Sequence, residues 1–219
     1  MQNRVFLFDM DGVLIDTERT WEKYGGDFLI NLLGKDIADK VGSTLGLNVN
    51  DVYRIALENG FAMDKDEYLK IYDEQAKFIY SKSSLTLGMD ELVKELHNLE
   101  FKIGLVSASR RSWIDEVLPR LSFGDSFEHI ISINDRPDLR NKPHPDGYIE
   151  AIRVLKGAPD VSMVLEDSNP GIQAGKSAGA YTIGFRKNLL PAYEQEGADV
   201  YADEVEDVIR IVKLSTKKE

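Results

Sequence analysis

Hydrophobic residues follow two patterns that alternate along most of the chain: short strand-like runs and longer stretches with helical spacing. The runs at residues 5–8, 102–106, 128–132, 161–165 and 182–185 are typical of buried strands. Helical spacing groups Leu92, Val93, Leu96 and Leu99 on one face, and Trp113, Ile114, Val117, Leu118 and Leu121 on another. Strands that alternate with helices predict an α/β fold with a parallel sheet covered on both faces, a Rossmann-like doubly wound core.

One interval breaks this alternation, because residues 17–84 contain helical patterns without a convincing strand run. The apolar faces there are Trp21, Tyr24, Phe28 and Leu32, then Val52, Ile55 and Ala56, then Tyr68, Ile71, Tyr72, Phe78 and Ile79. Gly34 and Gly60 are expected to end helices. We therefore expect residues 1–16 and 85–219 to form the α/β core and residues 17–84 to form an inserted all-helical cap. The cap fits either a lid over the site or a helical bundle without a role in it.

Composition limits the class of protein. No apolar stretch approaches the roughly 20 residues of a membrane span, and the first residues lack a secretory pattern, so we expect a cytoplasmic protein without membrane contact. A net charge of −11 argues against a nucleic-acid partner, which would require clustered lysine and arginine. The absence of cysteine excludes thiol nucleophiles and cysteine-bound metals. Any metal must be bound by oxygen or histidine, and His97, His129 and His144 lack metal-ligand spacing.

Polar residues follow the predicted strands where an open parallel sheet binds ligands, beyond the carboxyl ends of its strands. Asp9 and Asp11 follow the first strand, and Glu166 and Asp167 follow the fourth. Lys142 lies in the segment RNKPHPDGY, where two prolines stiffen its loop. Four acids and a lysine from distant parts of the sequence are therefore expected to meet at one edge of the sheet.

The acids have two interpretations. Asp9 and Asp11 alone fit solvated loop residues, because this triplet pattern is common. Glu166 and Asp167 at an equivalent strand end favour a hard-cation site, and oxygen ligands without histidine suit Mg²⁺. A bound cation would also relieve the repulsion between Asp9 and Asp11.

Ser107 and Lys142 each fit either phosphate binding or an ordinary structural role. Ser107 is expected to open a helix directly after the second strand, where its hydroxyl and the following N–H groups face an anion. An ordinary N-cap serine fits the same position. Lys142 fits a solvated surface lysine, but beside four acids it supplies the positive charge that a bound phosphate needs.

Four segments in this order, DMDGVLIDT, VSAS, KPHPD and LEDSNPGIQAG, resemble the four motifs of the haloacid dehalogenase superfamily. With a helical insertion after the first motif, the chain is similar to the beta-phosphoglucomutase-like phosphatase branch with a helical, C1-type cap. The resemblance covers essentially the whole core. It implies a Mg²⁺-dependent phosphohydrolase that acts on a small phosphorylated metabolite, with a sugar phosphate as the favoured substrate, and we expect a monomer.

The resemblance also implies residue roles. Asp9 would be the nucleophile that forms an aspartyl-phosphate, and Asp11 the general acid and base. Thr17 would lie at the cap hinge. The metal-binding residues would be Asp9, Asp11 through its carbonyl, Asp167, and Glu166 in or near the metal shell. The phosphate-binding residues would be Ser107, the Ala108 amide and Lys142.

The resemblance leaves two reactions open: hydrolysis of the phosphate ester by a phosphatase, and transfer of the phosphoryl group within one sugar by a mutase. Mutases of this branch hold a second phosphate with residues just after the serine motif, and they use a histidine and an arginine of the cap. No histidine occurs in residues 17–84, which favours hydrolysis over beta-phosphoglucomutase-type transfer. The candidate substrate-binding residues are Ser109, Arg110, Arg19, Arg54 and Trp21, the last at the position where a histidine would be sought.

A protein of another class also fits the fold: a metal- or phosphate-binding regulator without catalytic activity. Such a regulator needs no pair of nucleophile and acid. The presence of Asp9 and Asp11 together with Ser107, Lys142 and Asp167 therefore favours an enzyme.

Overall fold

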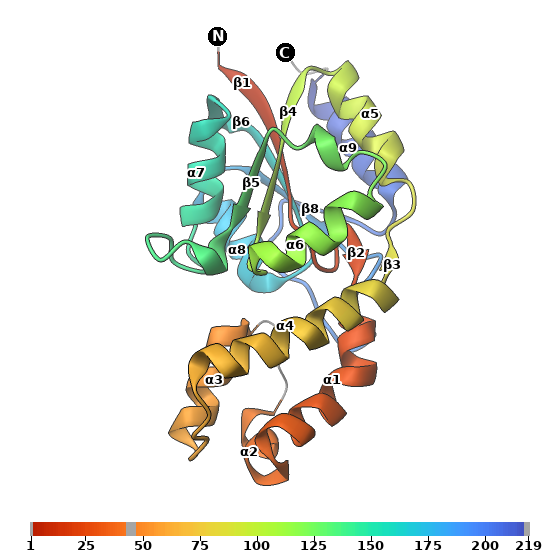
Figure 1. Cartoon of the computed structure of the whole chain (residues 1–219). Coiled ribbons are helices and arrows are strands. Elements are labelled where there is room, and N and C mark those ends of the chain that lie inside the picture. Colours follow the sequence, from red (N-terminus) through yellow and green to blue (C-terminus); the bar gives the residue numbers. More distant parts are fainter. Residues whose placement is uncertain (1, 43–46, 217–219) are drawn as a thin grey trace.

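A parallel sheet forms the centre of the computed structural model, which describes residues 2–42 and 47–216 (Figure 1). Its strand order is β5-β4-β1-β6-β7-β8, and every neighbouring pair is parallel. The strands are β1 (Asn3–Phe8), β4 (Phe101–Ser107), β5 (His129–Ser132), β6 (Gly157–Glu166), β7 (Tyr181–Phe185) and β8 (Val200–Ala202). The expected Rossmann-like α/β core is confirmed.

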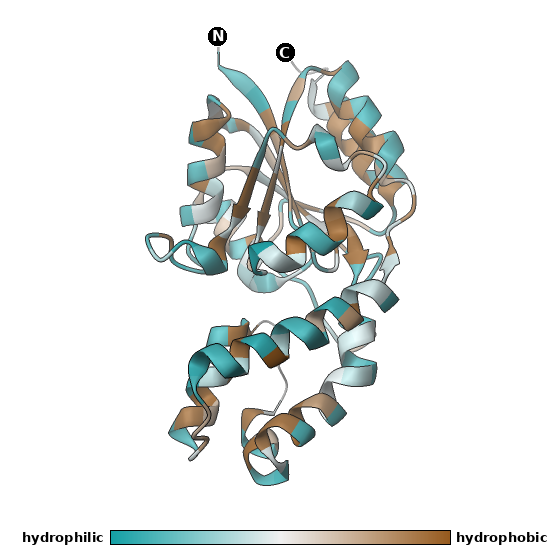
Figure 2. Cartoon of the chain, viewed as in Figure 1, coloured by the Kyte–Doolittle hydropathy of each residue, from teal (hydrophilic) through white to brown (hydrophobic). Residues whose placement is uncertain are grey.

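Helices cover both faces of this sheet because side chains along each strand alternate between the faces. In β1, Val5 and Leu7 belong to one apolar cluster, whereas Phe6 and Phe8 belong to the other. The first cluster includes α7 (Asp146–Val154) and α8 (Asn169–Ser177). The second includes α5 (Met89–Asn98), α6 (Arg111–Val117) and α9 (Val205–Ser215). Figure 2 shows the resulting hydrophobic strands between helices whose outer faces are hydrophilic.

The connections place a ligand crevice at the end of β1. The chain runs from β1 to β4 and β5 on one side, and then crosses to β6, β7 and β8 on the other. The strand order therefore reverses around β1, and loops that leave neighbouring strands diverge there. Open α/β sheets bind ligands at such a point, beyond the carboxyl ends of the strands.

The first four described helices after β1 lie beyond the carboxyl ends of the strands (Figure 1). They are α1 (Glu18–Leu33), α2 (Lys35–Val41), α3 (Val49–Glu58) and α4 (Lys65–Lys82). Gly34 ends α1 with φ of +79°, as expected for a glycine at that position. These helices occupy the interval predicted for the cap. The division of the chain into two domains at residues 17 and 84 stays a prediction.

Short strands were missed by the sequence pattern. Ile15–Asp16 (β2) pairs antiparallel with Ser84–Leu85 (β3) where the helical insertion leaves and rejoins the core. Each contains two residues, too few for an alternation to be recognised. The edge strand β8 contains three residues and was missed for the same reason.

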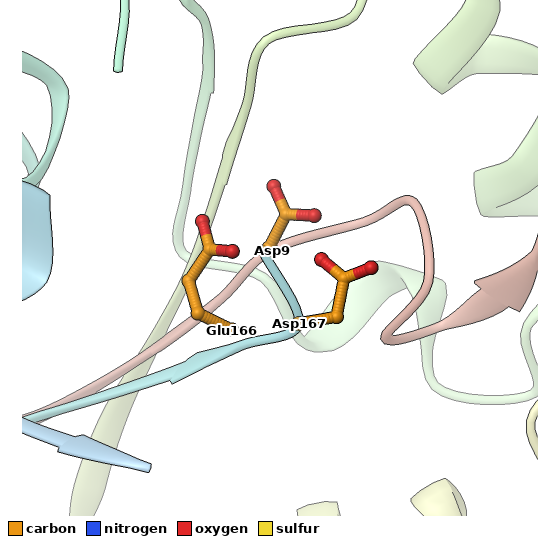
Figure 3. Close-up of side chains that lie close together, drawn as sticks. All are labelled: Asp9, Glu166 and Asp167. Carbon is orange, nitrogen blue, oxygen red and sulfur yellow. The ribbon is translucent and has the colours of Figure 1, made fainter. Parts of the chain in front are cut away.

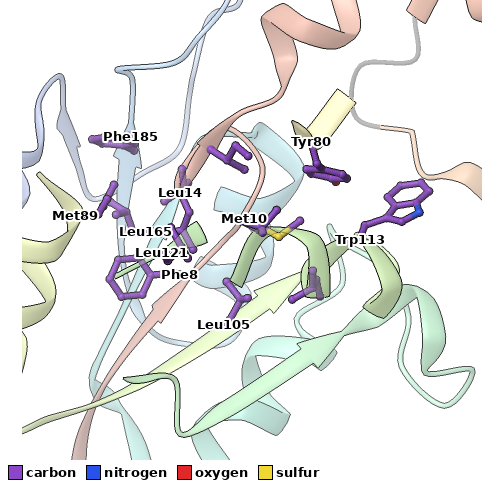
Figure 4. Packing of buried hydrophobic residues seen from close by; sticks show 14 of the residues in the cluster. Phe8, Met10, Leu14, Tyr80, Met89, Leu105, Trp113, Leu121, Leu165 and Phe185 are labelled. Atoms are coloured by element: carbon purple, nitrogen blue, oxygen red, sulfur yellow. The ribbon is translucent and has the colours of Figure 1, made fainter. Parts of the chain in front are cut away.

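One apolar cluster continues from the sheet into the inserted helices. It includes Phe8 and Leu165 of the sheet, Trp113 of α6 and Tyr80 of α4 (Figure 4). The rings of Tyr72 and Trp113 stack across the boundary, with centroids 6.1 Å apart and planes 17° apart. Packing across this boundary fixes how the insertion lies over the strand ends.

Within the described residues, no helix combines the length and apolar character that crossing a bilayer requires.

Candidate active site

Three buried acids meet where β1 and β6 end. Asp9 follows β1, Glu166 ends β6 and Asp167 comes next, while the Asp9 N–H donates to the Leu165 carbonyl at 3.0 Å. One carboxylate oxygen from each of the three acids lies within 4.8 Å of the others (Figure 3). The expected convergence of Asp9, Glu166 and Asp167 is therefore present.

Burial shifts the pKa of Asp9 and Asp167. It raises the pKa of Asp9, since desolvation penalises the charged form, and Glu166 and Asp11 add to the rise while Lys142 opposes it. Burial also raises the pKa of Asp167 well above its ordinary value, and the charges of Glu166 and Asp9 contribute. A cation at this point would stabilise the ionised acids.

Lys142 bridges the ends of the two strands. Its Nζ donates to Asp9 Oδ1 and Glu166 Oε1, both at 2.5 Å, and to the Val106 carbonyl at 3.2 Å. Burial alone would lower the pKa of Lys142, but the carboxylates of Asp9 and Glu166 outweigh this effect and raise it. The side chain is only 7% exposed, so the solvated-lysine alternative is wrong.

Glu166 is surrounded by hydrogen-bond donors that the sequence did not reveal. Tyr148 donates its hydroxyl to Glu166 Oε1 at 2.7 Å, beside the bond from Lys142. The Ser168 N–H and hydroxyl donate to Oε2 at 3.2 and 3.1 Å. Tyr148 belongs to the buried face of α7, where the sequence pattern indicates only packing. Both Glu166 oxygens are thus occupied, which indicates that this residue orients Lys142.

Two glycines allow the backbone to approach these acids. Gly12 has φ of +74°, and a Cβ there would lie 1.8 Å from Asp167 Oδ2. Gly171, in the first turn of α8, lies against Glu166, and its Cβ would come within 1.9 Å of the carboxyl group. Any larger side chain would displace an acid of the site.

Asp11 is held by hydroxyl groups from the core and the insertion. Ser109 donates to Oδ2 at 2.6 Å, while Thr17 and Tyr80 donate to Oδ1 at 2.8 and 3.0 Å. Burial raises the pKa of Asp11, and these three hydrogen bonds partly counteract the rise. Tyr80 of α4 was not singled out in the sequence, because it lies among apolar residues with helical spacing.

The segment after β4 begins with a turn, whereas the sequence predicted a helix there. Ser107 is the last residue of β4, and α6 begins only at Arg111, so Ser107 does not open a helix. Its hydroxyl instead accepts the Ser109 N–H at 3.0 Å, which stabilises a turn between strand and helix. Ala108 and Ser109 line the cavity described next, whereas Ser107 is fully buried.

A cavity of about 370 Å³ lies between the strand ends and the inserted helices. The predicted residues that line it are Asp9, Asp11, Trp21, Ala108, Ser109, Lys142 and Asp167. Glu18, the first residue of α1, also lines it and was missed by the sequence reasoning. Burial raises the pKa of Glu18 to about 7, and Asp11 and Asp16 add to the rise.

The structure does not bring the candidate arginines into this cavity. Arg19 pairs with Asp16 at 2.5 Å, and Arg54 pairs with Glu58 at 3.0 Å. Arg110 is among the residues that do not line the cavity, and its Nη1 donates to Asp73 of α4 at 2.8 Å.

The acids fit a hard divalent cation. The cluster offers carboxylate oxygens alone, which is the donor set that Mg²⁺ prefers. Asp167 lines the cavity, and its carboxylate accepts no hydrogen bond from any residue that the structure describes, whereas Glu166 accepts several. Asp9 and Asp167 are therefore the side chains best placed to bind a metal.

Comparisons with known proteins agree with this geometry. Residues 6–185 match the family model described as haloacid dehalogenase-like hydrolase. Hexitol phosphatase B of Escherichia coli K12 is 29% identical over 218 residues, covering 97% of this chain and 92% of that protein. Beta-phosphoglucomutase of Bacillus subtilis is 28% identical over 195 residues, covering 83% of this chain and 82% of that protein.

A solved structure has the same fold. The crystal structure of beta-phosphoglucomutase from Clostridium difficile matches with a TM-score of 0.76 and 24% identity. The match covers 99% of this chain and 98% of that one. The insertion of helices after the first strand is therefore shared along with the sheet.

Proposed function

Because the chain belongs to the haloacid dehalogenase-like hydrolase family, we propose that it is a Mg²⁺-dependent phosphohydrolase acting through an aspartyl-phosphate. Its substrate is a small phosphorylated metabolite, with sugar phosphates as the first class to test. One observation carries the proposal: Lys142 Nζ lies 2.5 Å from both Asp9 and Glu166 beside the cavity. A nucleophile, metal-binding acids and a phosphate-binding cation therefore share one site.

Asp9 begins the reaction. Its carboxylate oxygen attacks phosphorus, and the new O–P bond forms as the bond between phosphorus and the ester oxygen breaks. Asp11 donates its proton to the departing oxygen, so that a neutral alcohol leaves. The raised pKa of Asp11, caused chiefly by burial, supports a protonated acid at this stage.

Hydrolysis of the aspartyl-phosphate completes the cycle. Asp11, now ionised, takes a proton from a water molecule as that water attacks phosphorus. The bond between phosphorus and the Asp9 oxygen breaks, which releases inorganic phosphate and restores the carboxylate. The same residue thus acts as acid in the first half and as base in the second.

Positive charge must balance the phosphoryl group throughout. Bound Mg²⁺, held by Asp9, Asp167 and the Asp11 carbonyl, would supply most of it. Lys142 adds a fixed cation, and the Ala108 N–H is a further donor. Ser107 is buried behind the cavity lining and accepts the Ser109 N–H, so its contribution to phosphate binding stays a prediction.

The alternatives have less support. A beta-phosphoglucomutase-type reaction needs a site for a second phosphate, and the candidate arginines pair with carboxylates outside the cavity. A regulator without activity needs no acid two residues beyond the nucleophile, yet Asp11 is held by three hydroxyl donors. Hydrolysis accounts for both observations.

The test is release of inorganic phosphate from sugar phosphates, p-nitrophenyl phosphate, other small monoesters and pyrophosphate, with and without Mg²⁺. Asp9→Asn is compared with Asp125→Asn, which changes an exposed aspartate outside the cavity. We expect turnover that requires Mg²⁺, is lost in Asp9→Asn and is retained in Asp125→Asn. No release from any compound by the wild type would contradict hydrolysis. Interconversion of β-glucose 1-phosphate and glucose 6-phosphate would then support the mutase.

A further inference from the structure

The positive charge of the cavity is concentrated at one point. Among the described residues that line it, Lys142 is the only cation, and Lys142 already contacts Asp9 and Glu166. The arginines nearest in sequence to the site are paired with carboxylates elsewhere. Residues 43–46, which the structure does not describe, contain no basic side chain. Nothing cationic in the described cavity is therefore left for a second anionic group of a substrate.

Glu18 makes the remaining space acidic. Its carboxyl lines the cavity and accepts no hydrogen bond from any residue in the described part of the chain. It lies close enough to Asp11, Asp16 and Asp167 for their charges to influence one another. A substrate atom that approaches Glu18 thus meets an acceptor that has no partner of its own.

Aromatic and aliphatic groups form much of the wall. The rings of Trp21 and Tyr72 lie 5.8 Å apart, and Tyr72 stacks on Trp113. Leu189 and Leu190 add aliphatic surface. Such walls pack against the C–H faces of a carbon skeleton and offer no compensation for a charge.

A neutral amide group, that of Asn48, also lines the cavity. Asn48 Oδ1 accepts the N–H groups of Asn50 and Asp51 as the cap of α3, so its Nδ2 is the atom left to donate. Together with the Glu18 carboxyl, it offers one donor and one acceptor, which suits hydroxyl groups.

We propose that the site is selective for the monophosphate ester of an uncharged, hydroxyl-bearing alcohol, and that Glu18 enforces this selectivity by repelling a second anionic group. This inference rests on the phosphohydrolase function proposed above. A hydroxyl donates to Glu18 and accepts from Asn48, whereas a second phosphate or a carboxylate meets a like charge without a cation to offset it. Discrimination thus comes from repulsion of the wrong substrate.

Matched substrates test the selectivity of the Mg²⁺-loaded enzyme at about pH 8.5, where Glu18, whose pKa burial raises to about 7, is ionised. The pairs are fructose 6-phosphate with fructose 1,6-bisphosphate, and glycerol 3-phosphate with 3-phosphoglycerate, which differ mainly by one anionic group. We expect kcat/KM to be at least about tenfold higher for the member without it. The advantage should shrink between about 0.01 M and about 1 M salt, as the Debye length falls from roughly 30 Å to roughly 3 Å.

A pair of variants assigns the effect to Glu18. Glu18→Gln keeps the size of the side chain and removes its charge, so the ratio of kcat/KM within each pair should fall about threefold or more. Glu22→Gln, an exposed residue of the same helix outside the cavity, should leave that ratio unchanged. The ratio isolates charge selectivity from any general loss of activity.

Three outcomes would overturn the inference. They are a preference for the member with the second anion, an equal ratio in Glu18→Gln and Glu22→Gln, and turnover of p-nitrophenyl phosphate with none of the neutral-alcohol esters. All three leave the phosphohydrolase itself in place. Absence of turnover with every compound, p-nitrophenyl phosphate included, would instead remove the proposed function on which the inference rests.

Discussion

At the scale of single residues, the geometry of the candidate site depends on the side chains that surround the buried carboxylates as much as on those carboxylates. Glu166 illustrates this, because Lys142, Tyr148 and Ser168 all donate to it. A carboxylate whose two oxygens both accept hydrogen bonds has one preferred orientation. The bond from Lys142 to this fixed carboxylate in turn orients the lysine side chain. Glu166 is accordingly less available than Asp167 to bind a metal.

A glycine substitution tests this close packing. Gly171→Ala places a Cβ within 1.9 Å of the Glu166 carboxyl. We expect the free energy of unfolding to fall by about 1 to 3 kcal/mol, as for other overpacked sites, and phosphatase activity to fall with it. Gly26→Ala is the matched change, because its Cβ meets nothing within 4 Å on α1. It should stabilise the protein by up to about 1 kcal/mol. Equal effects of the two changes in urea unfolding would contradict this account.

His129 provides a pH-dependent prediction away from the site. Burial lowers its pKa, and Nε2 is buried without a hydrogen-bond partner in the described structure. Of the charged groups that influence it, Glu150 opposes the shift, while Arg136 and Arg153 add to it. Below about pH 6.5 the unfolded chain therefore takes up a proton at His129 more readily than the folded chain does.

Folded stability should consequently be lost at this residue as the pH falls. Between about pH 7.5 and about pH 5.5, the free energy of unfolding of the wild type should decrease more than that of His129→Gln. His97→Gln, at an exposed position, should follow the wild type. If the free energy of unfolding changed with pH in the same way for the wild type and His129→Gln, the His129 ring would not contribute to the pH dependence of stability.

At the scale of elements, α4 and α6 form the principal contact between the inserted helices and the core. Asp73 of α4 accepts from Arg110 Nη1 at 2.8 Å and from Trp113 Nε1 at 2.6 Å, both on or beside α6. Next to these bonds, Tyr72 stacks on Trp113. Arg110 therefore serves the contact between elements in this structure, and the candidate role in substrate binding has no geometric support.

Removal of Asp73 should weaken this contact. Asp73→Ala leaves the Arg110 guanidinium and the Trp113 N–H unpaired and partly buried, so the free energy of unfolding should fall by about 1 to 3 kcal/mol. Hydrogen exchange should accelerate in α4 more than in α8. Glu74→Ala, an exposed neighbour on α4, should change stability by about 0.5 kcal/mol or less. Similar exchange rates in the two variants would contradict a specific contact.

The same elements show which parts of the fold the sequence predicted. The five longer strands contain short runs rich in apolar residues, so their places could be predicted, whereas β2, β3 and β8 are too short for any period. The helix after β4 begins three residues later than expected, because the Ser107 hydroxyl bonds to the Ser109 N–H and forms a turn. Local hydrogen bonds of this kind leave no periodic signal.

The candidate site likewise contains residues that the sequence predicted and residues that it did not. Asp9, Glu166, Asp167 and Lys142 could be predicted to meet because each follows or precedes a strand of one parallel sheet. Tyr148, Tyr80 and Glu18 could not, since each lies on a helix whose pattern indicates packing or a solvated turn. Their roles depend on which helix faces which, and that is decided by tertiary packing.

At the scale of the whole molecule, which has a net charge of −11, the ion pairs differ in how deeply they are buried. Among the described residues, most ion pairs have at least one exposed partner, and pairs between two exposed partners contribute little. The Lys142 pairs are the buried exception, with side chains of Lys142, Asp9 and Glu166 at 7%, 9% and 0% exposure. Loss of Lys142 would leave the two buried acids without a counter-charge.

The central position of β1 also has a consequence for biosynthesis. Of the strands of this sheet, β1 leaves the ribosome first, yet its two neighbours are completed only at residues 107 and 166. Until then a strand of consecutive apolar residues, followed by Asp9, keeps two open edges. A nascent chain arrested before β6 would therefore expose an unpaired edge of β1, which is prone to aggregation. We expect chaperones to bind the chain at this stage.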